Sequence, residues 1–359
     1  MNRIVKAVLG LAMPATALVA GSLLSKKHKA SELPDCLIDL HLHLDGSISL
    51  ASAKQLAAMQ GIEIPDSDDE IKKLLSLTED CRDLNEYLEK FIFPLSLLQT
   101  KEAISQAVFN LKEELKAQGL IYAEIRFAPQ RHCDKGLTQE DAVLAAIEGM
   151  NRSDLKTNLI LCCMREKDNS DANLETIRLA DKYRDMGVCA ADLAGDEASY
   201  KMDDFKYVAD KAKYLGLFYT LHAGEAAGHE NVRRAIELDT CRIGHGIRAY
   251  ENLYTLKIVA DRRVPLEFCP TSNLNTSIFE NIEDYPLRRY LDVGAVVTIN
   301  TDNMSVSDTT LRKEFKKLID TFELTKDEVK TLLLNSANAA FVSEKEKAEL
   351  TEKIEKAFE

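Results

Sequence analysis

The sequence of 359 residues contains no tryptophan and only 8 proline and 15 glycine residues. So few glycines and prolines exclude a collagen-like or Gly/Pro-rich chain. A hydrophobic fraction of 45% excludes wholesale disorder. The eight cysteines include no Cys-x-x-Cys pair, and several lie within apolar runs. They therefore predict small buried thiols in a reducing compartment and not a disulfide framework.

Basic side chains are also in short supply, and they are unevenly placed. Lys and Arg number 46 against 59 Asp and Glu, which gives a formal net charge of −13. Five of the basic residues lie within residues 1–30, which hold no acidic residue, so residues 31–359 carry a net charge of −18. This acidity argues against a nucleic-acid or anionic-membrane partner, because both require a basic face.

The segment 7–24 is uncharged and mostly apolar, and it follows two basic residues. This pattern is typical of a signal peptide or a short membrane anchor. However, Pro14 interrupts the run and three lysines follow it, which fits a cytoplasmic extension instead. We therefore expect residues 1–30 to be an extension outside a single domain of residues 31–359. A cytoplasmic protein is expected, with export or a membrane tether through 7–24 as the alternatives.

After residue 35 the chain alternates short apolar runs with longer amphipathic stretches. The apolar runs predict strands at 37–43, 121–127, 158–164, 188–193, 217–222, 241–245, 265–269 and 295–300. From the second run onward, their starts are 24 to 37 residues apart. A (β/α)₈ barrel of about 250 residues needs about 31 residues per unit. The sequence therefore predicts an α/β fold of the TIM-barrel type, in preference to a doubly wound sheet.

Two parts of the chain exceed this repeat. The gap after the first strand predicts a helical insertion, with helices near 50–60, 68–75 and 84–98. Such an insertion would lie over the carboxyl ends of the strands, where a barrel carries its active site. The tail from residue 311 onward predicts extra C-terminal helices, two of them at 325–341 and 343–358.

The first apolar run ends in His41 and His43. Residues i and i+2 of a strand face the same side, so both imidazoles are expected to point into the mouth of the barrel. Two histidines at this spacing can hold a metal such as zinc. The alternative is a pair of core histidines that are hydrogen-bonded to their neighbours.

Other predicted strands also end in polar residues. The fifth ends in His222 and is followed by Glu225, the sixth ends in His245, and the eighth is followed by Asp302. Three imidazoles and a carboxylate can bind zinc and leave a position for water, whose pKa the metal lowers. Glu225 could hold a proton for a substrate, or it is a solvated loop acid. The remaining three histidines are expected to be solvated: His28, His132 and His229.

Six motifs occur in order along the chain: HLHLDGS (41–47), DLAGDE (192–197), HAGE (222–225), RIGHG (242–246), CPTSN (269–273) and NTDN (300–303). Together they resemble the adenosine deaminase family of the amidohydrolase superfamily, over residues 36 to 341. The resemblance implies a zinc-dependent hydrolase that converts adenosine and 2′-deoxyadenosine to inosine and 2′-deoxyinosine and releases ammonia.

The resemblance also implies a role for each matching residue. One zinc ion per chain would be held by His41, His43, His222 and Asp302. Glu225 would donate a proton to purine N1, while His245 and Asp302 would orient the water that attacks C6. The backbone N–H of Gly195 would meet purine N3. The fourth predicted strand ends without the lysine that often bridges two metals in related barrels, which agrees with a single ion.

Two further positions concern the substrate. Asp45 would contact a ribose hydroxyl, with His43 beside it, whereas related adenine deaminases tend to carry Glu at that position. Asp45 therefore favours a nucleoside, unless it only caps a helix. Asn303 stands where many family members carry Asp, and its amide can still donate a hydrogen bond to purine N7.

The segment 87–95 resembles the gate helix of the family. Leu88 and Phe91 would then face the substrate, or they only pack against neighbouring helices. Arg126 is expected to form a structural salt bridge. Two alternative functions remain, a deaminase of adenine or of a modified purine and a non-catalytic protein with this fold. The presence of every expected ligand argues against the second. The other zinc deaminase design carries a Pro-Cys-x-x-Cys signature, which is absent here.

Overall fold

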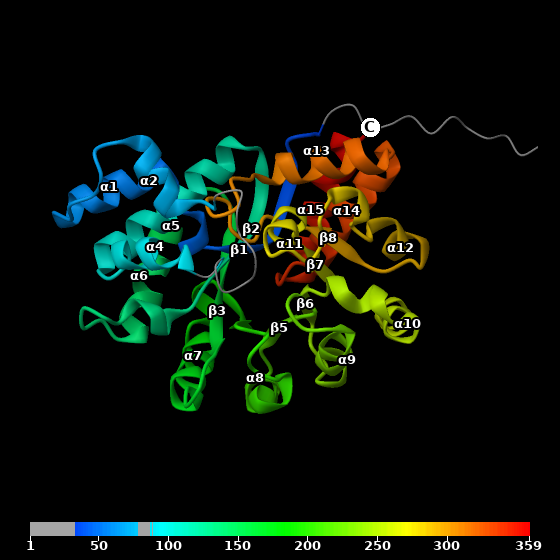
Figure 1. The fold of residues 1–359 in the computed structure, drawn as a ribbon, viewed down its shortest axis with the longest axis horizontal. Coiled ribbons are helices and arrows are strands. Elements are labelled where there is room, and N and C mark those ends of the chain that lie inside the picture. The colour runs from blue at the N-terminus through cyan, green and yellow to red at the C-terminus, as the bar shows by residue number, and fades with distance from the viewer. Residues whose placement is uncertain (1–32, 78–86, 88) are drawn as a thin grey trace, which may run out of the picture.

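The computed structural model describes residues 33–77, 87 and 89–359. Eight parallel strands follow one another in chain order around the centre of the molecule, and helices surround them (Figure 1). The strands are β1 (Leu37–His43), β2 (Leu120–Phe127), β3 (Thr157–Arg165), β4 (Val188–Gly195), β5 (Phe218–Ala223), β6 (Arg242–His245), β7 (Leu266–Phe268) and β8 (Val297–Ile299). The predicted (β/α)₈ barrel is confirmed.

The helices occupy the amphipathic stretches between the strands. They are α1 (Leu50–Gln60), α2 (Asp68–Leu75), α4 (Ile92–Leu97), α5 (Lys101–Ala117), α6 (Gln139–Asn151), α7 (Ser170–Lys182), α8 (Lys206–Leu215), α9 (His229–Glu237), α10 (Leu253–Arg262), α11 (Pro270–Asn275), α12 (Leu287–Asp292), α13 (Leu311–Phe322), α14 (Lys326–Ala339) and α15 (Glu344–Ala357). Local chemistry sets several helix starts. At α14, for example, Thr325 and Glu328 form a reciprocal capping box.

β1 shows how the strands divide their side chains. Leu40 and Leu42 are fully buried in the hydrophobic core, whereas His41 and His43 alternate with them and face the other side. Both faces of a barrel strand are covered, so the strand can carry apolar residues on its outer face and functional residues on its inner face. The predicted orientation of the two imidazoles is therefore confirmed.

The barrel closes between β1 and the end of β8 without a regular ladder. An isolated parallel bridge links Leu42 and Asp302. The N–H of His43 donates to the Asp302 carbonyl at 2.7 Å, and the N–H of Asp302 donates to the His41 carbonyl at 2.8 Å. Further along this seam, the side-chain oxygen of Asn300 accepts a hydrogen bond from the backbone of β1 at 3.0 Å. The closure therefore lies at residues that the sequence predicts to be functional.

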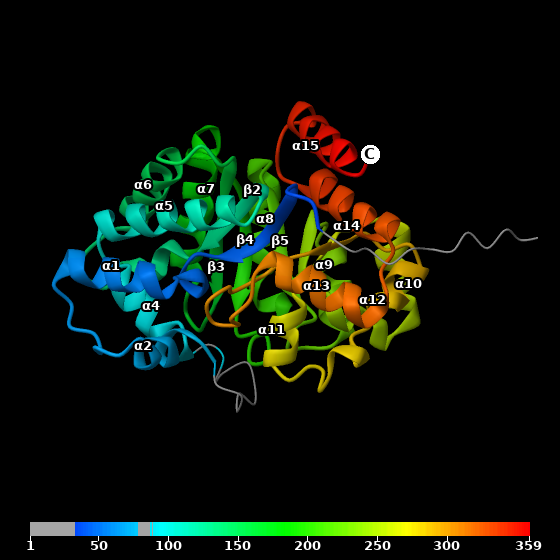
Figure 2. The same ribbon diagram turned by 90° about the horizontal axis from the view of Figure 1, so that it is seen from above.

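The two ends of the barrel are covered by different helices (Figure 2). Helices α2 and α11 lie at one end and α15 lies toward the other, whereas α14 packs alongside β8 and β1. Phe341, which follows α14, is buried at the second end. Its N–H donates to the Glu124 carboxylate at 2.6 Å, and its ring lies 3.6 Å from the guanidinium carbon of Arg242. The residue that follows α14 thus helps to close the amino-terminal end and leaves the carboxyl-terminal end for the site.

The helix predicted at 84–98 is interrupted in the structure. In the described part of this stretch, Tyr87 and Glu89 are helical, residues 90–91 form a turn, and α4 spans Ile92–Leu97. Pro94 explains the break, because a proline inside a continuous helix lacks the N–H that would bond to residue 90. With α4 starting at Ile92, Pro94 falls in the first turn, where no such bond is needed.

The expectation that His132 is solvated is wrong. His132 is fully buried, its Nδ1 lies 2.9 Å from the Leu98 carbonyl, and its ring packs edge-on against Phe127. The carbonyl comes from the insertion after β1, which folds back over this turn. His229 is partly exposed, and His28 lies outside the described residues.

The cysteines of the described chain are all free thiols, as expected from their spacing. None of its helices combines the length and the apolar character that a membrane span requires. Segment 7–24 lies outside the described residues.

The burial of His132 predicts a pH dependence of stability. Burial lowers the pKa of His132 from 6.5 to about 4 in the folded protein. The unfolded chain therefore binds more protons than the folded chain between these pH values, so the free energy of unfolding decreases as the pH falls through this window. Between pH 7 and pH 4.5 the His132→Gln variant should lose about 2 kcal/mol less than the wild type in urea unfolding. Equal losses would contradict this assignment.

Candidate metal centre and active site

A cavity of about 460 Å³ opens at the carboxyl ends of the strands. This volume is typical of a small-molecule site. His41 is fully buried beside it, with its ring centroid 4.6 Å from that of His222. Leu88 lies outside the described residues. The cavity lining includes the other predicted site residues: His43, Asp45, Phe91, Gly195, His222, Glu225, His245, Asp302 and Asn303.

Three imidazoles and one carboxylate converge at this cavity. Ligand atoms of His41, His43 and His222 all lie within 4.8 Å of one another. Asp302 Oδ1 lies 3.3 Å from His41 Nε2 and 3.4 Å from His43 Nε2. Ligands about 2.0 Å from a tetrahedral zinc ion are separated from one another by about 3.3 Å. The observed spacing of these groups therefore suits such an ion.

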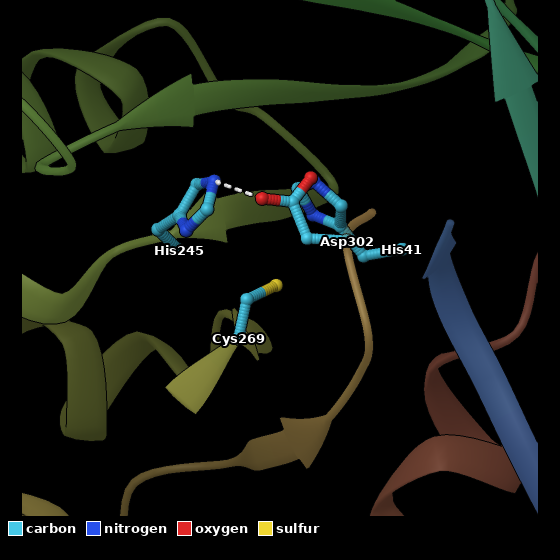
Figure 3. A group of neighbouring side chains, drawn as sticks. All are labelled: His41, His245, Cys269 and Asp302. Atoms are coloured by element: carbon cyan, nitrogen blue, oxygen red, sulfur yellow. Dashed lines mark ion pairs between the residues drawn. The ribbon is translucent and has the colours of Figure 1, made fainter. Parts of the chain in front are cut away.

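A second grouping combines His41 and Asp302 with His245 and Cys269 (Figure 3). His245 Nε2 lies 4.0 Å from Asp302 Oδ2. The buried Cys269 thiol lies 3.4 Å from the Glu267 carbonyl and donates to it. Burial raises the pKa of this thiol well above its usual range. Because metals bind the thiolate form, Cys269 suits the site less well than the carboxylate and the imidazoles.

Buried carboxylates fix the tautomers of two imidazoles. His41 Nδ1 lies 2.8 Å from Glu267 Oε2, and His222 Nδ1 lies 3.1 Å from Asp192 Oδ1. An ionised carboxylate can only accept, so each Nδ1 carries a hydrogen, and in the neutral imidazole that binds a metal each Nε2 presents a lone pair. His41 Nε2 is a buried atom without a hydrogen-bond donor in the described structure. A cation would satisfy it, and this pairing of imidazole with carboxylate is typical of metal-ligating histidines.

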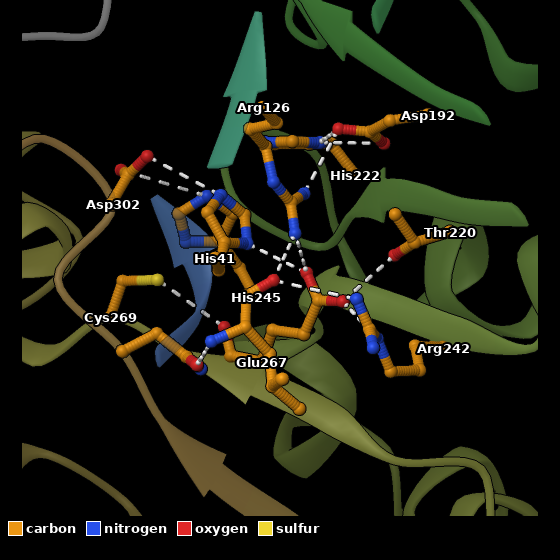
Figure 4. Close-up of polar contacts among 12 residues, drawn as sticks. His41, Arg126, Asp192, Thr220, His222, Arg242, His245, Glu267, Cys269 and Asp302 are labelled. Carbon is orange, nitrogen blue, oxygen red and sulfur yellow. Dashed lines mark hydrogen bonds and ion pairs between the residues drawn. The ribbon is translucent and has the colours of Figure 1, made fainter. Parts of the chain in front are cut away.

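Arg126 joins the two carboxylates (Figure 4). Its Nη1 lies 3.0 Å from Asp192 Oδ2, and its Nη2 lies 2.9 Å from Glu267 Oε2. Burial alone would raise the pKa of Glu267, but Arg126 and Arg242 hold it well below its usual range. The expectation that Arg126 forms a structural salt bridge is confirmed. Its guanidinium keeps ionised the groups that orient the imidazoles.

His245 has the opposite tautomer. The Nδ2 of Asn273 lies 3.1 Å from His245 Nδ1, and the hydroxyl of Tyr285 donates to Asn273 Oδ1 at 3.1 Å. An amide nitrogen can only donate, so His245 Nδ1 accepts and Nε2 carries the hydrogen. That Nε2 lies 3.7 Å from Glu225 Oε2. His245 therefore presents an N–H to the cavity, where His41 and His222 present lone pairs.

The backbone is unusual at His245 and Asp302, where φ is 59° and 60°. Side chains other than glycine rarely adopt this left-handed region, and each such residue costs about 1–3 kcal/mol. His245 is the last residue of β6, and Asp302 lies three residues beyond the end of β8. Both side chains line the cavity. The fold maintains this strain at two positions that the sequence predicts to be catalytic.

Glu225 is buried and lines the cavity, so the alternative of a solvated loop acid is wrong. Burial, followed by the negative charges of Asp302 and Glu197, raises the pKa of Glu225 well above its usual range. A raised pKa favours the protonated form of this carboxyl group, which can donate a hydrogen bond or a proton.

Other predicted substrate contacts occupy different parts of the cavity wall. Asp45 is buried, and burial raises its pKa to about 6. It does not cap the first helix, because Ser49 does so. Gly195 has φ of +95°, which requires glycine whether or not a ligand approaches. Asn303 Nδ2 donates to the Tyr87 hydroxyl at 3.0 Å, which leaves its second hydrogen free for another acceptor.

Sequence reasoning missed several residues that support the site. Glu267 lies in the middle of the apolar run 265–269, and a charged residue at such a position is a signal for a buried polar network. Asp192 and Glu197 belong to the DLAGDE motif, in which only Gly195 was assigned a role. Tyr87 gave no signal, because its position at the cavity depends on how the insertion folds back.

Comparisons with known proteins identify the relatives of this chain. The family model described as adenosine deaminase matches residues 36–357. An adenosine deaminase of Haemophilus ducreyi is 48% identical over 331 residues, which cover 90% of this chain and 96% of the relative. The crystal structure of an adenine deaminase of Arthrobacter aurescens aligns with a TM-score of 0.81 at 26% identity, over 90% of this chain and 99% of that one. A zinc-containing amidohydrolase of Burkholderia ambifaria gives the same TM-score at 22% identity, over 91% and 90% of the chains.

Proposed function

The chain belongs to the adenosine deaminase family, and from this membership we propose that it hydrolyses adenosine and 2′-deoxyadenosine to inosine and 2′-deoxyinosine, with release of ammonia. The reaction places the protein in purine salvage. The observation that carries the proposal is the buried acid Glu225 beside His245 and a set of metal-binding side chains, all in one cavity.

The proposed ligands of one zinc ion per chain are His41, His43, His222 and Asp302. The lone pairs directed by Glu267 and Asp192, together with the unpartnered Nε2 of His41, support this set. When bound, zinc supplies a Lewis acid that lowers the pKa of a water molecule toward neutrality. His245, with its N–H directed into the cavity, is not part of the proposed ligand set.

The remaining residues act on the substrate and on the water. Glu225 donates its proton to purine N1, which makes C6 more electrophilic. The buried position of Glu225 supports this role, because burial raises the pKa of the carboxyl group and so favours its protonated form. His245 and Asp302 orient the water for attack on C6, and their pairing at 4.0 Å supports a shared proton acceptor. The C6 amino group then leaves as ammonia, and oxygen takes its place.

Substrate recognition is proposed to use the cavity wall. The N–H of Gly195 meets purine N3, and the free amide hydrogen of Asn303 donates to N7. Asp45, with His43 beside it, accepts a hydrogen bond from a ribose hydroxyl. Phe91 provides an apolar wall, and its place in the cavity lining supports this assignment. Leu88 is proposed as a further part of that wall.

The proposed partner is a neutral nucleoside, with no role for nucleic acid. Residues 31–359 carry a net charge of −18, which disfavours phosphorylated ligands. We propose a cytoplasmic enzyme, with anchoring or export through 7–24 as the alternative. Residues 1–30 lie before the first motif, so their removal leaves the proposed chemistry in place.

A second candidate function is deamination of adenine or a modified purine base. The similarity in fold to an adenine deaminase favours it. Asp45 separates the two candidates, because a ribose contact is of use only to a nucleoside enzyme. Its burial within the cavity supports the nucleoside.

The function is tested by incubating the purified protein with adenosine and following the fall in absorbance near 265 nm. We expect turnover that a chelator abolishes and zinc restores, because the water that attacks C6 needs the metal to lower its pKa. Adenine at the same concentration should react at least about 100-fold more slowly, since it cannot contact Asp45. No adenosine turnover in the presence of zinc would overturn the proposed function, and faster turnover of adenine would favour the second candidate.

The proton-donor role predicts the behaviour of the Glu225→Gln variant. Glutamine has the same shape but cannot donate an acidic proton, so kcat should fall about 100- to 10,000-fold. Zinc content, measured by elemental analysis, should stay at one ion per chain because Glu225 is not a proposed ligand. The matched Glu230→Gln variant, on an exposed position of α9, should retain full activity. A Glu225→Gln enzyme with wild-type kcat would refute the assignment.

A further inference from the structure

Glu197 is a buried carboxylate that the proposed reaction does not use. It is only 2% exposed and lies two residues beyond the end of β4. Its two oxygens accept five hydrogen bonds. Oε1 accepts from the N–H of Gly224 at 2.7 Å and from Asn231 Nδ2 at 2.9 Å. Oε2 accepts from the N–H groups of Glu225, Ala226 and Ala227 at 2.8, 2.8 and 3.2 Å.

Four of these donors are consecutive backbone N–H groups, from residues 224–227. Successive N–H groups that turn toward one point form an anion-binding nest, and the carboxylate of Glu197 fills this one. Gly224 begins the nest with φ of +73°. Within the described ranges of the chain, Glu197 has no ion pair with a basic side chain, although Arg165 acts on it electrostatically. The backbone of this loop is therefore the main partner of the buried charge.

The carbonyl groups of the same loop are held from the opposite side. Arg248 Nε donates to the Glu225 carbonyl at 2.9 Å, and the N–H of Arg248 donates to the Gly224 carbonyl at 3.2 Å. The loop forms neither helix nor strand, so it has no regular ladder of its own. The conformation of the loop therefore depends on its hydrogen bonds with Glu197 and Arg248.

The Glu225 carboxyl makes no hydrogen bond of its own within the described residues. The nearest recorded polar group is His245 Nε2, at 3.7 Å, which is beyond hydrogen-bond distance. No hydrogen bond within the described residues therefore fixes the position of this carboxyl group. Its place in the cavity follows from where the backbone of residue 225 is held.

We propose that Glu197 is a positioning residue for the deamination reaction. By holding the N–H groups of residues 224–227, its carboxylate sets the position from which Glu225 reaches the purine. This inference rests on the proposed function and on the proton-donor role of Glu225. A misplacement of about 1 Å at a catalytic group can cost about 100-fold in rate. Loss of the nest's anion should therefore affect the chemical step more than the binding of the nucleoside.

The test is the Glu197→Gln variant of the full chain, assayed with adenosine. Glutamine replaces one accepting oxygen with an amide group that can only donate. Depending on its orientation, the acceptor is lost either by the N–H of Gly224 and the side-chain amide of Asn231 or by the N–H groups of residues 225–227. We expect kcat to fall about 100-fold while KM changes by less than about threefold. The Kd of inosine should stay within about threefold of wild type, because the purine and ribose contacts are unchanged.

Hydrogen–deuterium exchange supplies a readout that does not depend on activity. The peptide that contains residues 224–227 should exchange at least about tenfold faster in Glu197→Gln than in wild type, because at least one of its amides loses its acceptor and the loop is held less firmly. Peptides from the other strand ends should exchange at the wild-type rate. The Glu230→Gln variant makes the same chemical change on exposed α9 and should alter neither kcat nor exchange in this loop.

Each outcome has a distinct meaning. If wild-type protein turns over adenosine and Glu197→Gln retains its kcat, or if KM rises in proportion to the loss of rate, the positioning role is wrong and the proposed function stands. If the wild type itself fails to turn over adenosine, the proposed function is wrong. Should Glu197→Gln fail to fold, Asn231→Ala removes one hydrogen bond to the same carboxylate. That variant should lower kcat at least about threefold at constant KM, and wild-type kcat would overturn the proposal.

Discussion

Two backbone hydrogen bonds join the first strand to Asp302, which lies three residues beyond the last strand, and the arrangement of the site depends on them. The N–H of His43 meets the Asp302 carbonyl, and the N–H of Asp302 meets the His41 carbonyl. The same three residues carry three of the four proposed zinc ligands. Because the seam that closes the barrel also sets their separation, any change in strand register would shift the ligands as well.

The seam sets where the ligands lie, and a buried charge network sets the form that they take. Glu267 and Asp192 fix the tautomers of His41 and His222, and Arg126 holds both carboxylates ionised. Buried ion pairs of this kind contribute little net stability, because their desolvation offsets their attraction. Their value here is orientation. Asn273 gives His245 the opposite tautomer, so one cavity presents both lone pairs and an N–H.

The sequence predicted the parts of this arrangement that follow from local pattern. Strand spacing gave the barrel, and the motifs at strand ends identified His41, His222, His245 and Asp302. Contacts between elements that are distant in the sequence leave no local pattern, so the residues that depend on them were not predicted. His132 was mistaken for a solvated residue, since the carbonyl that covers it comes from the folded insertion. Glu197 was passed over within its motif because its partners lie in the next βα loop, about 30 residues away.

The residues behind the active-site imidazoles, Glu267, Asp192 and Asn273, give these imidazoles opposite tautomers. Two-bond ¹H–¹⁵N correlation spectra of protein labelled with ¹⁵N-histidine measure this directly, with assignments from single His→Gln variants. His41 and His222 should carry hydrogen on Nδ1, and His245 should carry it on Nε2. A spectrum in which His245 shares the Nδ1–H form of the other two would contradict the account.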